Sequence, residues 1–251
     1  MKNPLKILLF VMICIICIES NAQTFGVKGG LSLMNMMMKD ESENFKDLLK
    51  MKPGFHLGAT VNIPLYRELL SLEPGIFLNM KGYNWKEDGT GDGYDWKTTE
   101  KVGAYYIDIP INVKGVFGGE KIKGYGTLGP FIGVGLSGNC KTIYEVSVGN
   151  FTTTSEETEK IDWGKDEVED FLKRLDLGIA LGAGAIYHNF TLGISYDLGL
   201  KNISSYTDEE YKIKTRILKI SAGYLFGKKT RSRRGNDKRV GRAFSPEEFN
   251  Y

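Results

Sequence analysis

The sequence has few of the residues on which enzymes, metal sites and disulfide-stabilised folds usually depend. Of its 251 residues, three are cysteine and two are histidine. Cys14 and Cys17 lie in the apolar N-terminal segment, which leaves Cys140 without a partner for an internal disulfide. His56 and His188 stand far apart in the chain, and no recognisable catalytic motif accompanies them. The sequence therefore predicts a protein with no enzymatic activity and no cofactor.

Long apolar runs are missing beyond the N-terminal segment, so no transmembrane helix is expected there. Two lysines precede an apolar stretch at 7–18, and Ser20-Asn21-Ala22 offers small residues to a signal peptidase. Residues 1–22 are therefore predicted to be a signal peptide. The alternative, a retained anchor, would need a longer apolar core. With 33 Lys and Arg against 31 Asp and Glu, the net charge of +2 favours no class of partner.

The sequence is rich in alternation between apolar residues and small or polar ones. Between 175 and 187, every odd position holds Leu, Ile, Ala or Tyr, whereas even positions up to 184 hold Asp176, Gly or Ala. A period of two indicates β-strands, and runs of about ten residues are long enough for tilted membrane-spanning strands. An apolar face opposite a small, polar face predicts an outer-membrane β-barrel with lipid outside. A soluble β-sandwich or lipocalin-type barrel, the alternative, would turn the same faces the other way.

The alternating pattern recurs eight times in the mature chain. We expect strands at 24–34, 55–65, 69–85, 102–117, 122–140, 175–187, 190–200 and 212–226. Their connections are long at 35–54, 86–101 and 141–174, medium at 201–211, and short at 66–68, 118–121 and 188–189. Membrane barrels alternate short periplasmic turns with longer external loops in this way. The predicted fold is all-β: an eight-stranded, antiparallel, up-and-down transmembrane β-barrel with long extracellular loops, short periplasmic turns and both termini in the periplasm.

The predicted inner face carries eight charged residues, four of each sign. They are Lys28, Glu73, Lys81, Asp108, Lys114, Asp176, Asp197 and Lys219. An eight-stranded barrel is wide enough only to be filled by its own side chains or to hold something small. Balanced charges in that space predict a paired network that fills the barrel interior. A narrow polar channel is the alternative.

Three prolines lie within the predicted strands. Pro74, Pro110 and Pro130 each remove a backbone hydrogen-bond donor from the third, fourth and fifth strands. Because a closed barrel has no free edge on which to place them, we expect β-bulges at these positions.

Two short motifs have alternative interpretations. The glycines at 124, 126 and 129 match the spacing of dinucleotide sites, but a strand continues after them where that site needs a helix. Asp88, Asp92 and Asp95 lie in a glycine-rich loop and are candidate calcium ligands. Their spacing is not that of an EF-hand, and Asp-Gly pairs form ordinary turns. We therefore predict a loop without a metal ion.

The long loops are the candidate contact regions. The first is expected to hold a short helix, with Ser42 as N-cap and Phe45, Leu48 and Leu49 on one side. The third, 141–174, combines a Thr-rich hairpin near 150–154 with an acidic stretch at 166–170. Either loop could meet a partner outside the cell or simply cap the barrel.

A basic tail follows the last predicted strand. Residues 228–251 contain eight Lys and Arg residues and form a segment that we predict to be disordered and periplasmic. An envelope protein is a candidate partner of this tail, as it is of the loops, whereas the periplasm offers no nucleic acid. The predicted domains are therefore the signal peptide 1–22, the barrel 23–227 and the tail 228–251.

Several stretches, taken in order, resemble the PorT-type outer-membrane β-barrel proteins of the Bacteroidetes. They are Phe25-Gly26-Val27-Lys28-Gly29-Gly30-Leu31, Leu72-Glu73-Pro74-Gly75, Tyr106-Ile107-Asp108-Ile109-Pro110, Asp176-Leu177-Gly178 with Gly182 and Gly184, and Tyr196-Asp197-Leu198-Gly199-Leu200. The resemblance covers the mature chain to Phe226 and implies an eight-stranded outer-membrane barrel with prolines in its strands. The founding type is associated with type IX protein secretion. The long third loop and the basic tail depart from the family pattern.

We therefore expect a monomeric, non-enzymatic protein of the Gram-negative outer membrane, surrounded by lipid, with a structural or binding role carried by its external loops. Two other roles stay open. One is a component of protein secretion that docks through the basic tail. The other is a narrow channel for small solutes.

Overall fold

The computed structural model describes residues 23–39, 48–67, 69–119, 121–164, 172–205 and 212–227. The predicted signal peptide and the basic tail lie outside these residues. Among the described residues, no helix has the length and apolar character to cross a membrane.

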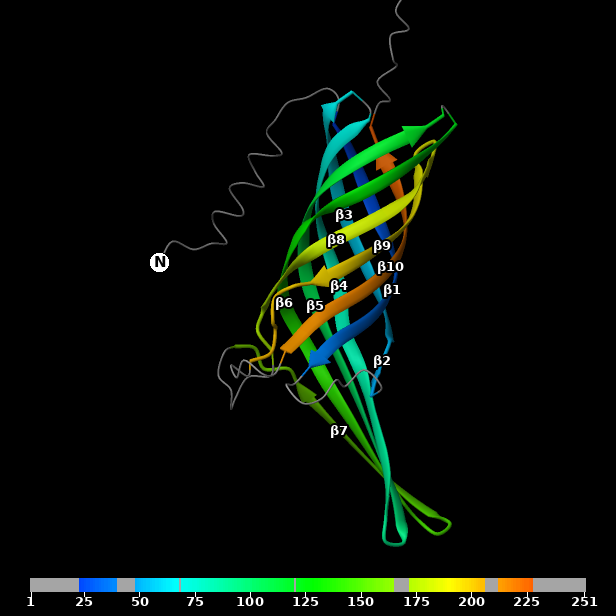
Figure 1. Cartoon of the computed structure of the whole chain (residues 1–251), viewed down its shortest axis with the longest axis vertical. Helices are drawn as coiled ribbons and strands as arrows, with labels where there is room; N and C mark the ends of the chain where they lie inside the picture. The colour runs from blue at the N-terminus through cyan, green and yellow to red at the C-terminus, as the bar shows by residue number, and fades with distance from the viewer. Residues whose placement is uncertain are drawn as a thin grey trace, which may run out of the picture.

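Eight antiparallel strands form a closed ring (Figure 1). They are β1 (Thr24–Lys39), β3 (Lys52–Tyr66), β4 (Leu70–Gly91), β5 (Tyr94–Gly118), β6 (Ile122–Val148), β8 (Leu175–Tyr187), β9 (Phe190–Gly199) and β10 (Lys212–Phe226). Each pairs with the next member of the ring, and β1 closes the ring against β10, with Phe25 opposite Phe226. Two further strands, β2 (Leu49–Lys50) and β7 (Phe151–Lys160), pair with β4 and β6. The predicted eight-stranded, up-and-down barrel is confirmed.

The ring is apolar on the outside and polar within. On β8, Leu175, Leu177 and Ile179 are exposed, whereas Asp176 and Gly178 between them are buried. The same alternation repeats around the ring, so that a belt of exposed Leu, Ile and Phe side chains surrounds it. Soluble monomers rarely expose a continuous apolar belt of this size. Membrane barrels point their apolar side chains outward in this way, whereas soluble barrels point them inward.

The bulges predicted at the three prolines are wrong. Pro74 faces Ile111 and Phe77 faces Asp108, so β4 and β5 keep one register across Pro74 and Pro110. The pairing of β5 with β6 and of β6 with β8 likewise keeps its register at Pro130. The two positions after Pro74 have no partner in β5, and Pro130 has none there either. A missing donor therefore leaves a local gap in the pairing without inserting a residue.

The register shifts elsewhere. One shift lies between Pro64 and Tyr66 of β3. The other is in β6, where Tyr105 of β5 faces Ser137 and Tyr106 faces Gly135, which makes Leu136 the additional residue. Beyond a bulge the two faces of a strand exchange. Ser137, which the alternation places inside, is consequently exposed, and Gly138 is buried.

The second predicted long loop, 86–101, is a continuation of two strands. β4 and β5 extend together as a hairpin as far as the turn at Asp92-Gly93, and β6 and β7 do the same as far as Gly149-Asn150. Asp95 faces Ser147, so the two hairpins also pair with each other. Residues 86–101 and 139–160 thus form a four-stranded extension beyond the ring, here called the projecting sheet (Figure 1). It includes the Thr-rich hairpin predicted near 150–154.

The helix predicted in the first loop is contradicted at its C-terminal end. Leu49 belongs to β2 and faces Trp85 of β4. Pairing with the edge of β4 satisfies the backbone groups of this short segment and outweighs its local preference for a helix. Ser42 and Phe45 lie outside the described residues, as does the acidic stretch 166–170.

The outward facing of the apolar side chains gives a depth-dependent prediction. Leu181 lies at the centre of β8 and Tyr187 at its end, and both are exposed. In lipid vesicles, Leu181→Arg should lower the free energy of unfolding by about 2–4 kcal/mol and Tyr187→Arg by about 0–1 kcal/mol, because burial of a charge in lipid is costly only near the bilayer centre. Urea titration of the folded protein measures both. Equal effects would contradict a membrane position for this face.

Candidate functional site

The lumen of the ring is filled by charged side chains from most of its strands. Lys81 of β4 lies between Asp108 of β5 and Asp176 of β8, with its Nζ 2.9 Å from one carboxylate and 2.8 Å from the other. The side chains of Lys81 and Asp176 are 0% exposed. Thr215 donates a hydrogen bond to Asp176 (2.9 Å), and Asn79 donates one to Asp108 (2.5 Å). Because both acids share one lysine and receive further donors, the cluster keeps its charges without solvent.

Aromatic rings and a glycine complete this cluster. The Lys81 ammonium lies 4.6 Å from the ring centroid of Tyr106 and 4.8 Å from that of Phe131, within range of cation–π attraction. A side chain at Gly133 would overlap Asp108 and lie 2.9 Å from the Lys81 Nζ. The glycine of β6 is therefore needed to make room for the ion pairs.

A second cluster lies nearer the end of the ring that carries the short turns. Glu73 of β4 is placed between Lys28 of β1 (2.5 Å) and Lys114 of β5 (2.7 Å). Lys114 also donates to Asn62 (3.3 Å), and its Nζ lies 4.8 Å from the ring centroid of Tyr125. This arrangement is the inverse of the first, because one acid is shared by two lysines.

The remaining two of the eight predicted charges form a pair of their own, Lys219 of β10 with Asp197 of β9. Beside them, His56 of β3 exchanges hydrogen bonds with Ser32 of β1 (3.0 Å at Nδ1) and Ser221 of β10 (2.8 Å at Nε2). The structure thus places all eight charged residues in the lumen and brings them together in three groups. His56, which the sequence analysis did not single out for this role, links three strands across the closure of the ring.

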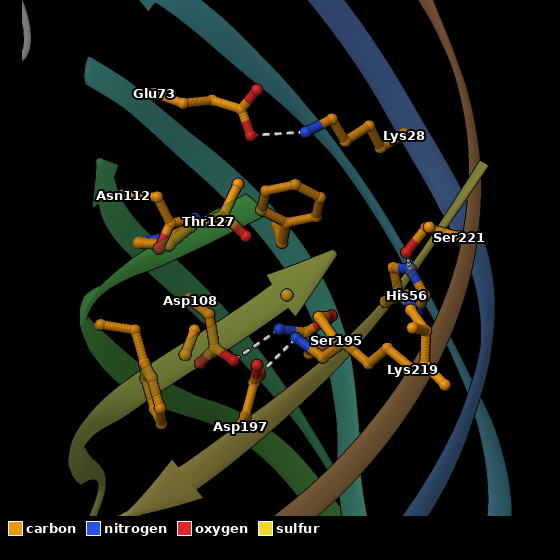
Figure 2. Close-up of a pocket in the computed structure, with 18 of the residues that line it drawn as sticks. Lys28, His56, Glu73, Asp108, Asn112, Thr127, Ser195, Asp197, Lys219 and Ser221 are labelled. Carbon is orange, nitrogen blue, oxygen red and sulfur yellow. Dashed lines mark hydrogen bonds and ion pairs between the residues drawn. The ribbon is translucent and has the colours of Figure 1, made fainter. Parts of the chain in front are cut away.

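A cavity of about 80 Å³ lies between these groups (Figure 2). Lys28, Glu73, Asp108, Asp197 and Lys219 line it, along with His56 and other polar residues. Its size suits a few water molecules. The arrangement can hold water or a very small solute.

An apolar cluster closes the lumen at the end that carries the hairpins. From the ring it includes Met36, Met38, Tyr83, Val102, Ala104, Tyr106 and Ile213. Ile161, Leu172 and Ile203, from the segments that follow β7 and β9, pack onto these residues. Trp163 covers Tyr106 edge to face, with 5.5 Å between ring centroids. The three capping residues lie outside any alternating pattern, so sequence reasoning had no signal for them.

The candidate metal ligands do not converge. Asp88 faces Lys97, Asp95 faces Thr90, and Asp92 occupies the turn between β4 and β5. The described residues contain no group of three or more His, Cys, Asp and Glu able to hold a metal ion. The glycines at 124, 126 and 129 lie within β6, without the helix that a dinucleotide site needs.

The projecting sheet has two unlike faces, because residues directly opposite one another share a face. Trp96 faces Val146, and Tyr94 lies opposite Gly91 on the same side. Together with Tyr144, Val148 and Phe151 they form what we call the aromatic face, which continues the lumen side of the ring. The opposite face is charged and carries the exposed ion pairs Lys97–Glu145 (3.0 Å) and Lys141–Glu156 (2.7 Å).

Residues 21–205 match the family model described as outer membrane protein beta-barrel domain. The chain belongs to this family. The closed ring, its apolar belt and this membership place the protein in the outer membrane. No curated protein matches the chain.

Three solved structures that are similar to this chain are outer-membrane proteins. Ail, the attachment invasion locus protein of Yersinia pestis, in complex with the heparin analogue sucrose octasulfate, is 15% identical, with 81% of this chain and 99% of that chain covered and a TM-score of 0.35. Neisserial surface protein A is 15% identical (81% and 97% covered, TM-score 0.34). The outer membrane protease OmpT of Escherichia coli is 10% identical (82% and 97% covered, TM-score 0.31). Likenesses this low add no function to the family assignment.

The first cluster allows a test of how the lumen is stabilised. Lys81→Met leaves Asp108 and Asp176 buried and unpaired, and should lower the free energy of unfolding by about 3–5 kcal/mol. Adding Asp108→Asn and Asp176→Asn should restore most of the loss, because no uncompensated charge then remains. Urea unfolding in lipid vesicles measures each variant.

The matched control is Lys97→Met, which breaks an exposed ion pair and should cost at most about 1 kcal/mol. If the single variant at Lys81 is as stable as this control, the lumen is more hydrated than the contacts indicate.

Proposed function

We propose that the protein is a non-enzymatic barrel with a structural or binding role, exercised by its projecting sheet outside the cell. The observation that carries the proposal is a contrast between two regions of one chain. The lumen is filled by ion pairs of nearly zero exposure and capped by an apolar cluster, whereas the projecting sheet presents exposed aromatic side chains beyond the ring. Surface for a partner is therefore available on the sheet and not in the lumen.

The arrangement of the connections supports an orientation with the short turns and both termini in the periplasm. The short connections β3–β4, β5–β6 and β8–β9, together with the start of β1 and the end of β10, lie at one end of the barrel, and the hairpins β4–β5 and β6–β7 lie at the other (Figure 1). Outer-membrane barrels place short turns in the periplasm and long connections outside. The projecting sheet then faces the surroundings of the cell.

A non-enzymatic role is supported by the surroundings of the two histidines. His56 contacts two serine hydroxyls in the lumen, and His188 lies in an exposed turn beside Tyr187. Among the described residues, neither histidine has a hydrogen bond to a carboxylate, the group that usually orients a catalytic imidazole. The alternative role in protein secretion would act through the basic tail 228–251, which lies outside the described residues. The PorT-type resemblance that suggests this role is one of sequence.

A plugged lumen predicts electrical silence. In planar bilayers the wild-type protein should give no conductance steps, and neither should Leu172→Ala, because the ion pairs around Lys81 close the lumen independently of the apolar cluster. Leu172→Ala combined with Lys81→Ala should be silent as well, because Glu73 with Lys28 and Lys114 still occupies the lumen. A porin added afterwards to the same bilayer controls for membrane quality. Discrete steps from the wild type would favour the channel.

A binding role of the projecting sheet predicts that trimming it removes contacts and spares the barrel. Replacing residues 143–156 with Asn-Gly joins Thr142 to Glu157, which already face each other. Folding, followed by heat-dependent migration on gels, should be unchanged. On living cells, a membrane-impermeant amine cross-linker should yield a protein adduct with the full chain and none with the trimmed one.

The replaced segment contains no lysine, so the reactive amines of the barrel are the same in both forms. An adduct that persists after trimming would contradict a binding role for the sheet.

A further inference from the structure

The outer strand of the projecting sheet has an open edge. β7 pairs with β6 along its whole length in one uninterrupted register. No described strand pairs with its other side, and all ten of its residues are exposed. A long edge strand of this kind offers a row of free N–H and C=O groups to another chain.

The sequence of β7 does little to protect that edge. Edge strands are usually blunted by proline, bulges or charged side chains, lysine above all. The charged residues of β7 are confined to its second half, at 156, 157, 159 and 160. β7 reads Phe-Thr-Thr-Thr-Ser-Glu-Glu-Thr-Glu-Lys, with no proline and a single lysine, Lys160, at its last position. Threonine is a good strand former, so the segment is suited to extended pairing.

The charge around the edge restricts what can pair with it. The projecting sheet contains nine Asp and Glu residues and five Lys residues, so its net charge is −4. Glu156 is paired with Lys141 on the charged face. Glu157 and Glu159 lie on the opposite face, and the described residues provide no ion-pair partner for either. A second copy of β7 would bring its own glutamates to this edge, whereas a basic segment would neutralise it.

The aromatic face supplies apolar contacts beside the same edge. Phe151, at the start of β7, is 84% exposed, and its neighbour Val148 on β6 is exposed as well. An added strand places alternate side chains on this face. Strand addition of this kind takes its affinity from backbone hydrogen bonds and its specificity from the side chains.

We propose that β7 is the docking edge for an extended, basic segment of a partner protein, which adds as a fifth strand to the projecting sheet. Cationic side chains of the segment lie opposite Glu157 and Glu159, and an apolar one covers Phe151. The inference rests on the proposed function, because it specifies the site and the partner class for binding by the sheet.

The test uses the full chain in detergent micelles and a fluorescent ten-residue probe peptide in which every second residue is threonine and the residues between them are valine in one half and lysine in the other. Its valines and lysines then share one face, as Phe151, Glu157 and Glu159 do on β7. Anisotropy should show saturable binding, and hydrogen exchange of the amides in 151–160 should slow when the peptide is bound. The same peptide with alternate backbone amides methylated should bind at least tenfold more weakly, because it keeps its charge but cannot pair as a strand.

Protein variants separate this edge from general attraction. Glu157→Lys with Glu159→Lys should weaken binding of the probe at least tenfold. The matched control, Glu87→Lys with Asp95→Lys, makes the same change in net charge on β4 and β5 and should weaken it less than twofold. All four residues lie beyond the ring, and heat-dependent migration verifies that each variant folds.

Three results would overturn the inference: no binding of the probe, equal binding of the methylated peptide, or equal losses in the two pairs of variants. If any of these occurs while the cell-surface adduct still depends on residues 143–156, the binding role stands and the partner is of another class, such as a glycan on the aromatic face. If that adduct is also independent of the sheet, the proposed function fails as well.

Discussion

The fold depends on one constraint: within lipid, every backbone N–H and C=O group must find its partner in the protein. A row of strands meets this condition only when its first and last members pair, as β1 and β10 do from Phe25–Phe226 to Lys39–Lys212. Closure also explains why the prolines are tolerated as local gaps. Each strand has neighbours on both sides, so Pro130 can lose its partner in β5 and still face Ile179 in β8. The ring absorbs a missing donor without a change of register.

Closure with eight strands makes the lumen narrow, and the narrow lumen determines its chemistry. Side chains on the inner face cannot be solvated as they would be on a surface, so each charge needs a partner of opposite sign. Two acids around Lys81 and two lysines around Glu73 are complementary solutions to this requirement. Two of the pairs, Lys28–Glu73 and Lys81–Asp176, join strands that are not neighbours in the ring, and they add cross-links through the lumen to the hydrogen bonds around the ring. The same contacts that stabilise the barrel also occupy the space that a solute would need.

Much of the barrel could be predicted because the residues of a strand alternate between its two faces. The strand positions, the outward facing of Leu177 and Leu181 and the inward facing of Asp176 and Lys81 all follow from a period of two. Which charges pair does not follow, because Lys81 and Asp176 are 95 residues apart and meet only once the register of four strands is known. Leu136 shows the same limit, since nothing in its neighbourhood marks it as the extra residue of a bulge. Ile161, Leu172 and Ile203 act through contacts between separate loops, where no periodicity applies.

The projecting sheet shows what changes when the lipid constraint ends. Beyond the ring, water can satisfy a backbone group, so the sheet no longer has to close, and its strands end in an open edge at β7. The side chains still alternate between two faces there, but the two faces differ in character from those of the ring. The face that continues the lumen is aromatic, and the outer face carries exposed ion pairs such as Lys97–Glu145 where the ring carries leucine. An apolar outer face would be needed in lipid and is absent beyond it. An exposed aromatic face and an unpaired edge are costly to keep in water, and both lie on a described part of the chain that extends beyond the apolar belt, which is why we propose recognition and not stability as their role.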